Sequence, residues 1–511
     1  MIRTHIFSLK ISLSSLKMDN AAFRKSEELI SDIRSSGYFS IFQELNKIEM
    51  KTKLVLITVL VIFGIRANAQ PAGTSSGKPY AYIIKGGHVI DPKNNINSVM
   101  DIAFTAGRRG MAARPAMAER PAENGRPARP AVPARAAVPA SEGKIALIAK
   151  DINPDLADRI IDAKGLYVTP GLIDIHVHFF WGHDGSYLKN AATALPADGF
   201  TFRTGVTTVV DAGCTGWRDF ELYKKRTIDA SQTRVLTMLN IVGTGMDGAG
   251  ENNIDEMDPQ KTAEMAKKYP NDIVGVKLAH FSGRTWVPTD RALEAGRLAN
   301  IPIMVDFGSA DPYLPLDSLF NVKFRKGDIF THAFGGNGTD SPNGRESIVD
   351  MNGKVKPFVY KAREKGVVFD IGFGGASYLY NQGVPAVKQG FYPTTISTDL
   401  HTGSMNGPMK SMENIMGLIM ATGMPLKDVI AASTWHPAQA IKREELGNLS
   451  QGSVADIAIF RINEGDFGWP VRGGKITGKQ RLQTEMTIRA GNIVYDLDGL
   501  AQPAGPSPAG R

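Results

Sequence analysis

Short apolar runs alternate with longer helical stretches through the middle of the chain. Strands that alternate with helices in this way are typical of repeated βα units, which form a parallel sheet. Eight such runs predict an α/β protein built around a (β/α)8 TIM barrel. The predicted strands are residues 171–179, 205–211, 234–242, 272–280, 301–307, 328–334, 367–373 and 394–399.

Short alternating strands flank this region on both sides, at residues 80–167 and 452–495. Alternation of apolar and polar residues with period two is typical of strands that bury one face. We therefore predict that the two ends of the chain pair into a small β-sandwich beside the barrel. Its parts are residues 80–167 and 446–500, and the barrel occupies residues 168–445.

Polar residues stand at the ends of the predicted barrel strands, and functional groups gather at the C-terminal ends of the strands in this fold. The first strand ends in His176-Val177-His178. Because positions i and i+2 of a strand point to the same face, both imidazoles are directed toward the barrel mouth. Neutral imidazole binds zinc and similar divalent ions, so this pair is a candidate metal site.

Four strand ends together resemble the motifs of the amidohydrolase superfamily. The first motif is PGLIDIHVH at residues 170–178, and the others follow in the order of the family. They are Gly275-Val276-Lys277, Thr331-His332-Ala333-Phe334 and Ser397-Thr398-Asp399-Leu400-His401. The similarity spans roughly residues 80–498. Within the superfamily, the combination looks most like the deacetylase group that is related to dihydroorotases.

The resemblance implies a site for one or two divalent metal ions. His176 and His178 correspond to ligands of the first ion, which they share with Asp399, and His332 corresponds to a ligand of the second. Lys277 stands where binuclear members carry a lysine that is carboxylated on its amine, and this anionic carbamate bridges the two ions. Asp399 also handles the proton of the attacking water. Zinc is the expected ion, with manganese or iron as alternatives.

The fifth predicted strand departs from the family pattern, because it carries Asp306 where the family usually has a histidine. A carboxylate oxygen is an acceptable ligand for zinc or manganese, so we expect Asp306 to bind the second metal with His332. The alternative is that Asp306 is structural and one metal is retained. His280 lies three residues after Lys277, and this odd step points its side chain to the other face while the strand continues.

Three further residues are candidates with weaker patterns. Arg284, in the loop after the fourth strand, is expected either to hold a substrate carboxylate or to be a solvated loop charge. His401 lies two residues beyond Asp399 and is expected to line the mouth. Cys214 is interpreted as a small buried residue, because a metal-activated water needs no thiol nucleophile.

These features predict a metal-dependent hydrolase that cleaves an amide or ester bond of a small acylated compound through a metal-activated water. Its class is that of hydrolases acting on carbon–nitrogen bonds other than peptide bonds. One alternative is a cyclic amidase of the dihydroorotase or hydantoinase kind. Another is an exported binding protein that kept the barrel and lost turnover through Asp306.

The charge of the chain does not favour a nucleic-acid partner. The 511 residues have a formal net charge of +8, but the excess is local. Residues 1–69 carry ten Lys and Arg against six Asp and Glu, and residues 107–141 carry seven Arg against two Glu. The remainder is close to neutral. The single cysteine excludes an internal disulfide and a Cys-ligated zinc site. A homo-oligomer stays open.

Residues 50–69 have the layout of a secretory signal peptide. A basic start, MKTK, precedes twelve mostly apolar residues at 54–65, and Ala67-Asn68-Ala69 gives a small-x-small pattern. We predict cleavage after Ala69, an exported protein in the periplasm or the medium, and no stable membrane insertion afterwards. The alternative is an uncleaved anchor, although the run is shorter than the ~20 residues of a spanning helix. Residues 1–49 are interpreted as a spurious extension.

Two other segments are predicted to be unstructured. Residues 107–141 repeat Ala, Arg and Pro, and such a tract cannot bury enough apolar surface to fold. Its flanks at 100–104 and 144–148 are typical of one interrupted hairpin. We interpret the insert as a solvated loop, with binding of an acidic polymer as the alternative. The tail at 501–511 is rich in Pro, Gly and Ala.

Overall fold

The computed structural model describes residues 77–108, 139–180, 194–246, 249–307, 312–336, 345–375 and 377–501, with a few isolated positions between them. The chain divides into two units, Met1–Pro71 and Ala72–Arg511, and all described residues belong to the second. The predicted extension at 1–49 and signal peptide at 50–69 lie outside the described residues. So do most of the insert at 107–141 and all of the tail after Ala501.

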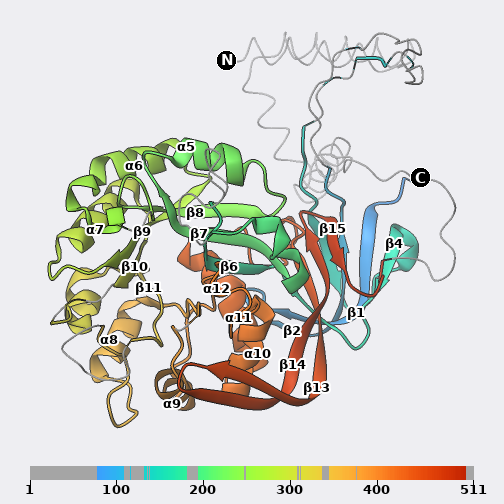
Figure 1. Cartoon of the computed structure of the whole chain (residues 1–511). Coiled ribbons are helices and arrows are strands. Elements are labelled where there is room, and N and C mark those ends of the chain that lie inside the picture. Colours follow the sequence, from blue (N-terminus) through green and yellow to red (C-terminus); the bar gives the residue numbers. More distant parts are fainter. Residues whose placement is uncertain are drawn as a thin grey trace, which may run out of the picture. The chain divides into compact units, whose positions relative to one another are not determined.

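A seven-stranded parallel sheet forms the centre of the second unit, and its strands follow one another in chain order from β6 to β12. Seven of the eight runs predicted as barrel strands overlap one of these strands. The sheet curls, and helices lie along its outer side (Figure 1). The strands are β6 Leu172–Val177, β7 Val206–Gly216, β8 Arg234–Asn240, β9 Ile273–Phe281, β10 Ile303–Phe307, β11 Ile329–Phe330 and β12 Val368–Phe369.

The eighth predicted run, at 394–399, forms isolated bridges instead of a regular strand. On one side, Thr395 bridges to Asp370, just after β12, in the parallel sense. On the other side, Leu400 bridges to Val177 of β6, and the Asp399 amide donates to the His176 carbonyl at 2.7 Å. This segment therefore makes backbone hydrogen bonds to both edges of the curled sheet.

Two of the helices show how the sequence sets a helix end. Asp258 accepts hydrogen bonds from the first amides of α6, and Asn300 ends α7 in the left-handed conformation. Gly296 lets α7 approach β10, because a Cβ there would lie 2.8 Å from Ile303 Cγ2. The helices are α5 Phe220–Tyr223, α6 Pro259–Lys268, α7 Val287–Ala299, α8 Pro357–Lys365, α9 Tyr380–Lys388, α10 Met412–Thr422, α11 Leu426–Ser433 and α12 Trp435–Ala440.

The remaining strands form a second sheet of eight strands, to which both ends of the described chain contribute. β13 pairs with β5 in the antiparallel sense, which joins the two ends. β2 pairs with β3 across the insert, as the interrupted hairpin predicts. The strands form one hydrogen-bonded network, so a division into the two layers of a sandwich stays a prediction. They are β1 Tyr80–Asp91, β2 Ile96–Phe104, β3 Ile145–Ala149, β4 Ala157–Asp162, β5 Tyr167–Pro170, β13 Ile457–Val471, β14 Gly474–Arg489 and β15 Asn492–Asp496.

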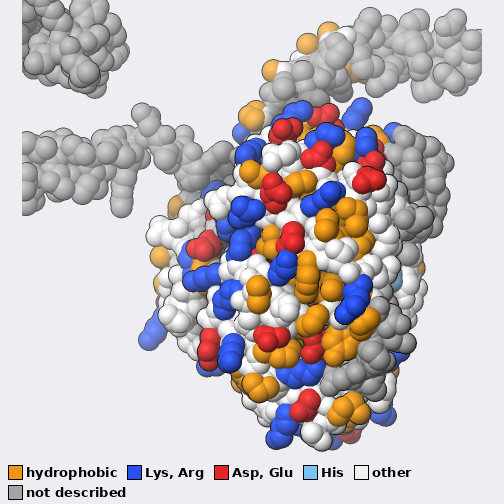
Figure 2. Space-filling model, turned by 90° about the vertical axis from the view of Figure 1, so that its left-hand side faces the viewer, with side chains coloured by type: hydrophobic (Ala, Val, Ile, Leu, Met, Phe, Trp, Pro, Cys, Tyr) orange, Lys and Arg blue, Asp and Glu red, His pale blue; other side chains and the backbone are white. Residues whose placement is uncertain are grey.

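The face of the molecule shown in Figure 2 carries both positive and negative side chains. Lysine and arginine side chains alternate there with acidic and apolar ones. Within the described part of the chain, no helix has the length and apolar character needed to cross a membrane.

Candidate metal centre

Two histidines and an aspartate converge at the C-terminal end of β6. His176 and His178 are buried at 1% and 5% exposure, and their neighbour Asp399 follows the eighth run. Asp399 Oδ1 lies 2.9 Å from His178 Nε2 and 3.6 Å from His176 Nε2. The three donor atoms lie within 4.8 Å of one another. Two imidazole nitrogens and a carboxylate oxygen at this spacing fit a divalent ion.

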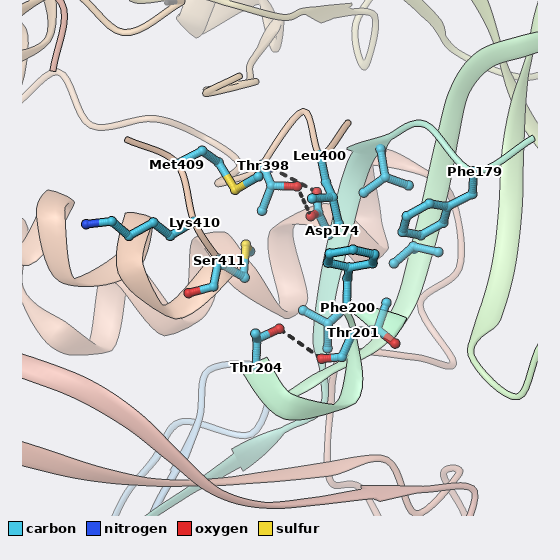
Figure 3. Close-up of a pocket in the computed structure, with 14 residues that line it drawn as sticks. Asp174, Phe179, Phe200, Thr201, Thr204, Thr398, Leu400, Met409, Lys410 and Ser411 are labelled. Carbon is cyan, nitrogen blue, oxygen red and sulfur yellow. Dashed lines mark hydrogen bonds between the residues drawn. The ribbon is translucent and has the colours of Figure 1, made fainter. Parts of the chain in front are cut away.

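Asp174 holds the eighth segment against β6 and so places Asp399 beside the histidines. Its carboxylate accepts hydrogen bonds from the Thr398 hydroxyl at 2.5 Å and from the Thr398 amide at 3.1 Å. Figure 3 shows the two side chains joined by hydrogen bonds beside a small cavity, which they line together with Phe200 and Met409. Burial raises the pKa of Asp174 to about 7.

The far ring nitrogens of these histidines are also in contact with the protein. His176 Nδ1 lies 2.8 Å from the Thr331 hydroxyl, which donates in turn to the buried carboxylate of Asp370. His178 Nδ1 lies 3.4 Å from Cys214 Sγ. Partners of this kind fix the ring orientation and leave Nε2 for a metal. Burial lowers the pKa of His176 well below its usual value, so its ring is neutral, as metal binding requires.

Lys277 lies on β9 directly beside this cluster. Its side chain is fully buried, and Nζ is 3.4 Å from His176 Nε2 and 3.7 Å from Met304 Sδ. Gly213 makes room for it, because a Cβ there would lie 2.7 Å from Lys277 Cγ. Burial lowers the pKa of the Lys277 amine.

Asp306 and His332 form a second group of donors next to the first. Asp306 Oδ2 lies 3.2 Å from His332 Nε2, and Oδ1 lies 3.0 Å from Arg345 Nη1. Burial raises the pKa of Asp306, but His332 and His280 outweigh it and hold this pKa well below the usual value. The rings of His176 and His332 are 5.0 Å apart, so the two groups are adjacent. Asp306 thus lies where the sequence predicts, and its role as a ligand stays a prediction.

The expectation that His280 faces away from the site is wrong. The strand β9 continues to Phe281, but His280 has a left-handed backbone with φ of 51°. Side chains no longer alternate regularly between the two faces of the strand at a residue with this backbone, and the His280 ring turns toward the site. His280 Nε2 lies 3.3 Å from Asp306 Oδ2, and Nδ1 lies 2.7 Å from Glu251 Oε2. The hydrogen bonds to Asp306 and Glu251 raise the pKa of His280 to about 10.

The weaker candidates occupy different places. His401 is partly buried at the mouth, with Nε2 3.9 Å from Asp399 Oδ2. Arg284 is exposed in the connection between β9 and α7, and none of the hydrogen bonds and ion pairs among the described site residues involves it. Cys214 is fully buried, and burial raises its pKa well above the usual value, which leaves the thiol protonated. It is a packing residue that also touches His178.

Sequence reasoning missed four residues that contact the candidate ligands. Glu251 lies in the short 3-10 helix Ala249–Asn252 and Arg345 in a loop, and Thr331 and Asp370 follow β11 and β12. Thr331 stands inside the quoted motif beside His332, so its polar side chain at a strand end was an available signal. Glu251 and Arg345 have no such signal, because no local sequence pattern indicates which charged residue between the strands will lie over the mouth.

Histidines and carboxylates at the C-terminal ends of parallel strands define the class of barrel enzymes that use a divalent metal. A family model described as the amidohydrolase family matches residues 383–494. A deacetylase of Enterococcus faecalis is 31% identical over 368 residues, which are 70% of this chain and 94% of the relative. A deacetylase of Brucella anthropi is 29% identical over 67% of this chain and 83% of its own.

A solved structure supports the same conclusion. The crystal structure of an adenine deaminase has a TM-score of 0.66 and 26% identity, and the match covers 82% of this chain and all of that one. The chain belongs to the amidohydrolase family. It is therefore a hydrolase of carbon–nitrogen bonds other than peptide bonds, and its family uses divalent metals.

Proposed function

We propose that the protein is a metal-dependent deacetylase that hydrolyses the amide or ester bond of a small acylated compound. The observation that carries this proposal is the convergence of His176, His178 and Asp399 beside Asp306 and His332. The names of the two deacetylase relatives support the same reaction. We further propose that the parallel sheet closes into a complete (β/α)8 barrel, with residues 394–400 in the position of the eighth strand. The site lies at the mouth of this barrel.

The proposal assigns the donors to two ions. His176, His178 and Asp399 hold the first, and Asp306 and His332 belong to the second. Zinc is the expected metal, because three of these five side chains are imidazoles. A bound ion of this kind lowers the pKa of a water molecule and polarises a carbonyl group.

Lys277 is proposed to carry a carboxyl group on its amine. Its uncharged amine attacks carbon dioxide, a carbon–nitrogen bond forms, and one proton is released to give an anionic carbamate. The lowered pKa favours the uncharged amine that this reaction needs. Burial of a cationic ammonium beside His176 would be costly, whereas the carbamate is an oxygen donor that suits the metals around it.

Asp399 is proposed as the residue that moves the proton. Its Oδ1 faces the two histidines, whereas Oδ2 faces His401. Gly374 keeps that side open, because a Cβ there would lie 2.3 Å from Asp399 Oδ2. Oδ2 can therefore accept the proton of the attacking water and return it to the leaving nitrogen or oxygen. His401 and Arg284 are proposed to contact the substrate.

A panel of substrates tests the reaction. We expect the purified protein to release acetate from N-acetyl amino acids and Asp399→Asn to lose at least 100-fold in kcat, because a proton carrier is removed. Hydrolysis of hydantoins or dihydropyrimidines instead would support the cyclic amidase. Full metal occupancy without turnover of either group would support a binding protein and overturn the proposal.

A further inference from the structure

Three residues at the mouth share a backbone conformation that L-amino acids rarely adopt. Among the described non-glycine residues, eight have positive φ. Three of these eight lie at the site: His280 at 51°, His332 at 52° and Asp399 at 51°. Strained backbone of this kind persists where the surroundings hold it, and it clusters at functional sites. His332 and Asp399 are proposed metal ligands, and His280 shares their conformation.

The His280 ring is placed as a ligand would be. Asp306 Oδ2 lies 3.3 Å from His280 Nε2 and 3.2 Å from His332 Nε2. Neighbouring donors around a tetrahedral zinc ion with its usual bond lengths lie about 3.3 Å apart. Arg345 contacts the other oxygen, Oδ1, so Oδ2 is the oxygen that faces both rings.

The opposite nitrogens of these two rings are held by acceptors. His280 Nδ1 contacts the buried carboxylate of Glu251 at 2.7 Å, and His332 Nδ1 contacts the Gly372 carbonyl at 2.5 Å. Because both partners can only accept, each Nδ1 donates. A metal-binding histidine commonly donates its other N–H to a carboxylate or a carbonyl, which fixes the tautomer with Nε2 available.

We propose that His280 is a protein ligand of the second metal, together with Asp306 and His332. His280 on β9 thereby provides an imidazole ligand for the second metal, whereas Asp306 on β10 provides a carboxylate. Glu251 is a positioning residue that orients the His280 ring. This inference rests on the second metal of the proposed function, and it adds a ligand from outside the quoted motifs.

The rival explanation is an ion pair, in which protonated His280 only neutralises Asp306. Metal counting separates the two. His280→Asn suits the test because asparagine tolerates the left-handed backbone but its shorter amide does not replace the ring. His88→Ala is the matched control, since His88 lies on β1 of the other sheet. Four proteins are loaded with zinc, and the number of ions per chain is measured. They are the wild type, His280→Asn, His280→Gly and His88→Ala.

We expect two ions per chain in the wild type and in His88→Ala, and one in both His280 variants. Free imidazole should restore the second ion in His280→Gly, because the ring position is half-exposed and open to solvent. Glu251→Gln should weaken binding of the second ion 10- to 100-fold. With cobalt in place of zinc, the visible spectrum of His280→Asn should lose the contribution of the second site.

The outcomes separate this inference from the proposed function. Two tightly held ions in His280→Asn would leave the two-metal site intact and overturn the role of His280. One ion in the wild type would overturn the second site itself, and with it this inference. Hydrolysis of acylated substrates by such a one-metal protein would still support the proposed reaction.

Discussion

Each histidine of the candidate centre has its Nδ1 in contact with the protein and its Nε2 near a carboxylate oxygen. His332 shows the principle most clearly, because its Nδ1 faces a carbonyl that can only accept. The ring is therefore fixed in one tautomer before any ion arrives. Orientation of this kind reduces the entropy that binding would otherwise cost. The net charge around these rings depends on two further side chains, Lys277 beside His176 and Asp306 beside His332.

Lys277 offers the sharpest test at this scale. Lys277→Ala should lose metal and most activity, because no carbamate can form. Short-chain carboxylic acids should partly restore both when added, since they supply an anionic oxygen donor in the vacated space. Lys277→Arg should not be rescued, because guanidinium stays protonated and cannot be carboxylated. Metal analysis and acetate release measure the effect, and full activity in Lys277→Ala would contradict the bridging role.

Asp306 is tested by a pair of substitutions. Asp306→Ala should lower occupancy to about one ion per chain and leave the site of His176 and His178 filled. Asp306→His should retain two ions and shift the preference toward zinc, because imidazole is the softer ligand. Competition between zinc and manganese measures that shift. Unchanged occupancy and turnover in Asp306→Ala would make Asp306 a structural partner of Arg345.

At the scale of elements, the segment 394–400 matters more than its lack of regular strand structure suggests. It carries Asp399, and its position depends on contacts with β6 on one side and the end of β12 on the other. The Thr398 hydroxyl bonded to Asp174 is one of these contacts, and both residues are buried.

Thr398→Val should therefore affect stability and metal binding together. The substitution conserves shape but leaves a buried carboxylate oxygen with one donor fewer, which costs about 1–3 kcal/mol. The thermal midpoint should fall, and the first metal should bind more weakly because Asp399 is less well placed. Thr422→Val is a matched control, since that hydroxyl bonds within α10 to Leu418. Equal metal affinity in the two variants would contradict the positioning role.

The sequence predicts the elements better than it predicts their ends. Apolar runs locate seven strands because burial on both faces selects β-branched and aromatic residues. The pair His176 and His178 follows from alternation within a regular strand. His280 does not, because its left-handed backbone breaks that alternation and no local pattern encodes it. Glu251 and Arg345 reach the mouth from the connections between the strands, and their positions depend on the tertiary fold.

A shortened chain tests whether the insert at residues 107–141 contributes to the fold or the site. Arg108 and Ser141 exchange two backbone hydrogen bonds, at 2.7 and 2.9 Å, so they form a closed pair at its base. An Asn-Gly turn joining these two residues matches the geometry of a two-residue hairpin. Because loop length changes closure entropy by only about 0.6 kcal/mol per doubling, stability, metal content and turnover should be nearly unchanged. Loss of solubility or activity would show that the insert contributes contacts of its own.

At the scale of the whole second unit, the eight-stranded sheet lies against the N-terminal ends of strands in the parallel sheet, and the candidate site lies at their C-terminal ends. Arg234, at the start of β8, pairs with Asp456 and with Glu142 at 2.8 Å, which ties the N-terminal end of β8 to the second sheet. Gly205 packs so closely there that a Cβ would lie 2.7 Å from Phe460 Cζ. The C-terminal ends carry the candidate site, which is also where (β/α)8 barrels place their active sites.

Export belongs to the scale of the full chain and rests on residues outside the described structure. If residues 50–69 act as a signal peptide, protein recovered from an exporting host should begin at Gln70, and intact mass spectrometry would show this directly. Replacing Ala67 and Ala69 with arginine should block cleavage, because the peptidase requires small residues at these positions. The uncleaved protein should then stay with the membrane fraction. A mature chain that retains residues 54–65 without these changes would reject cleavage and support an anchored enzyme.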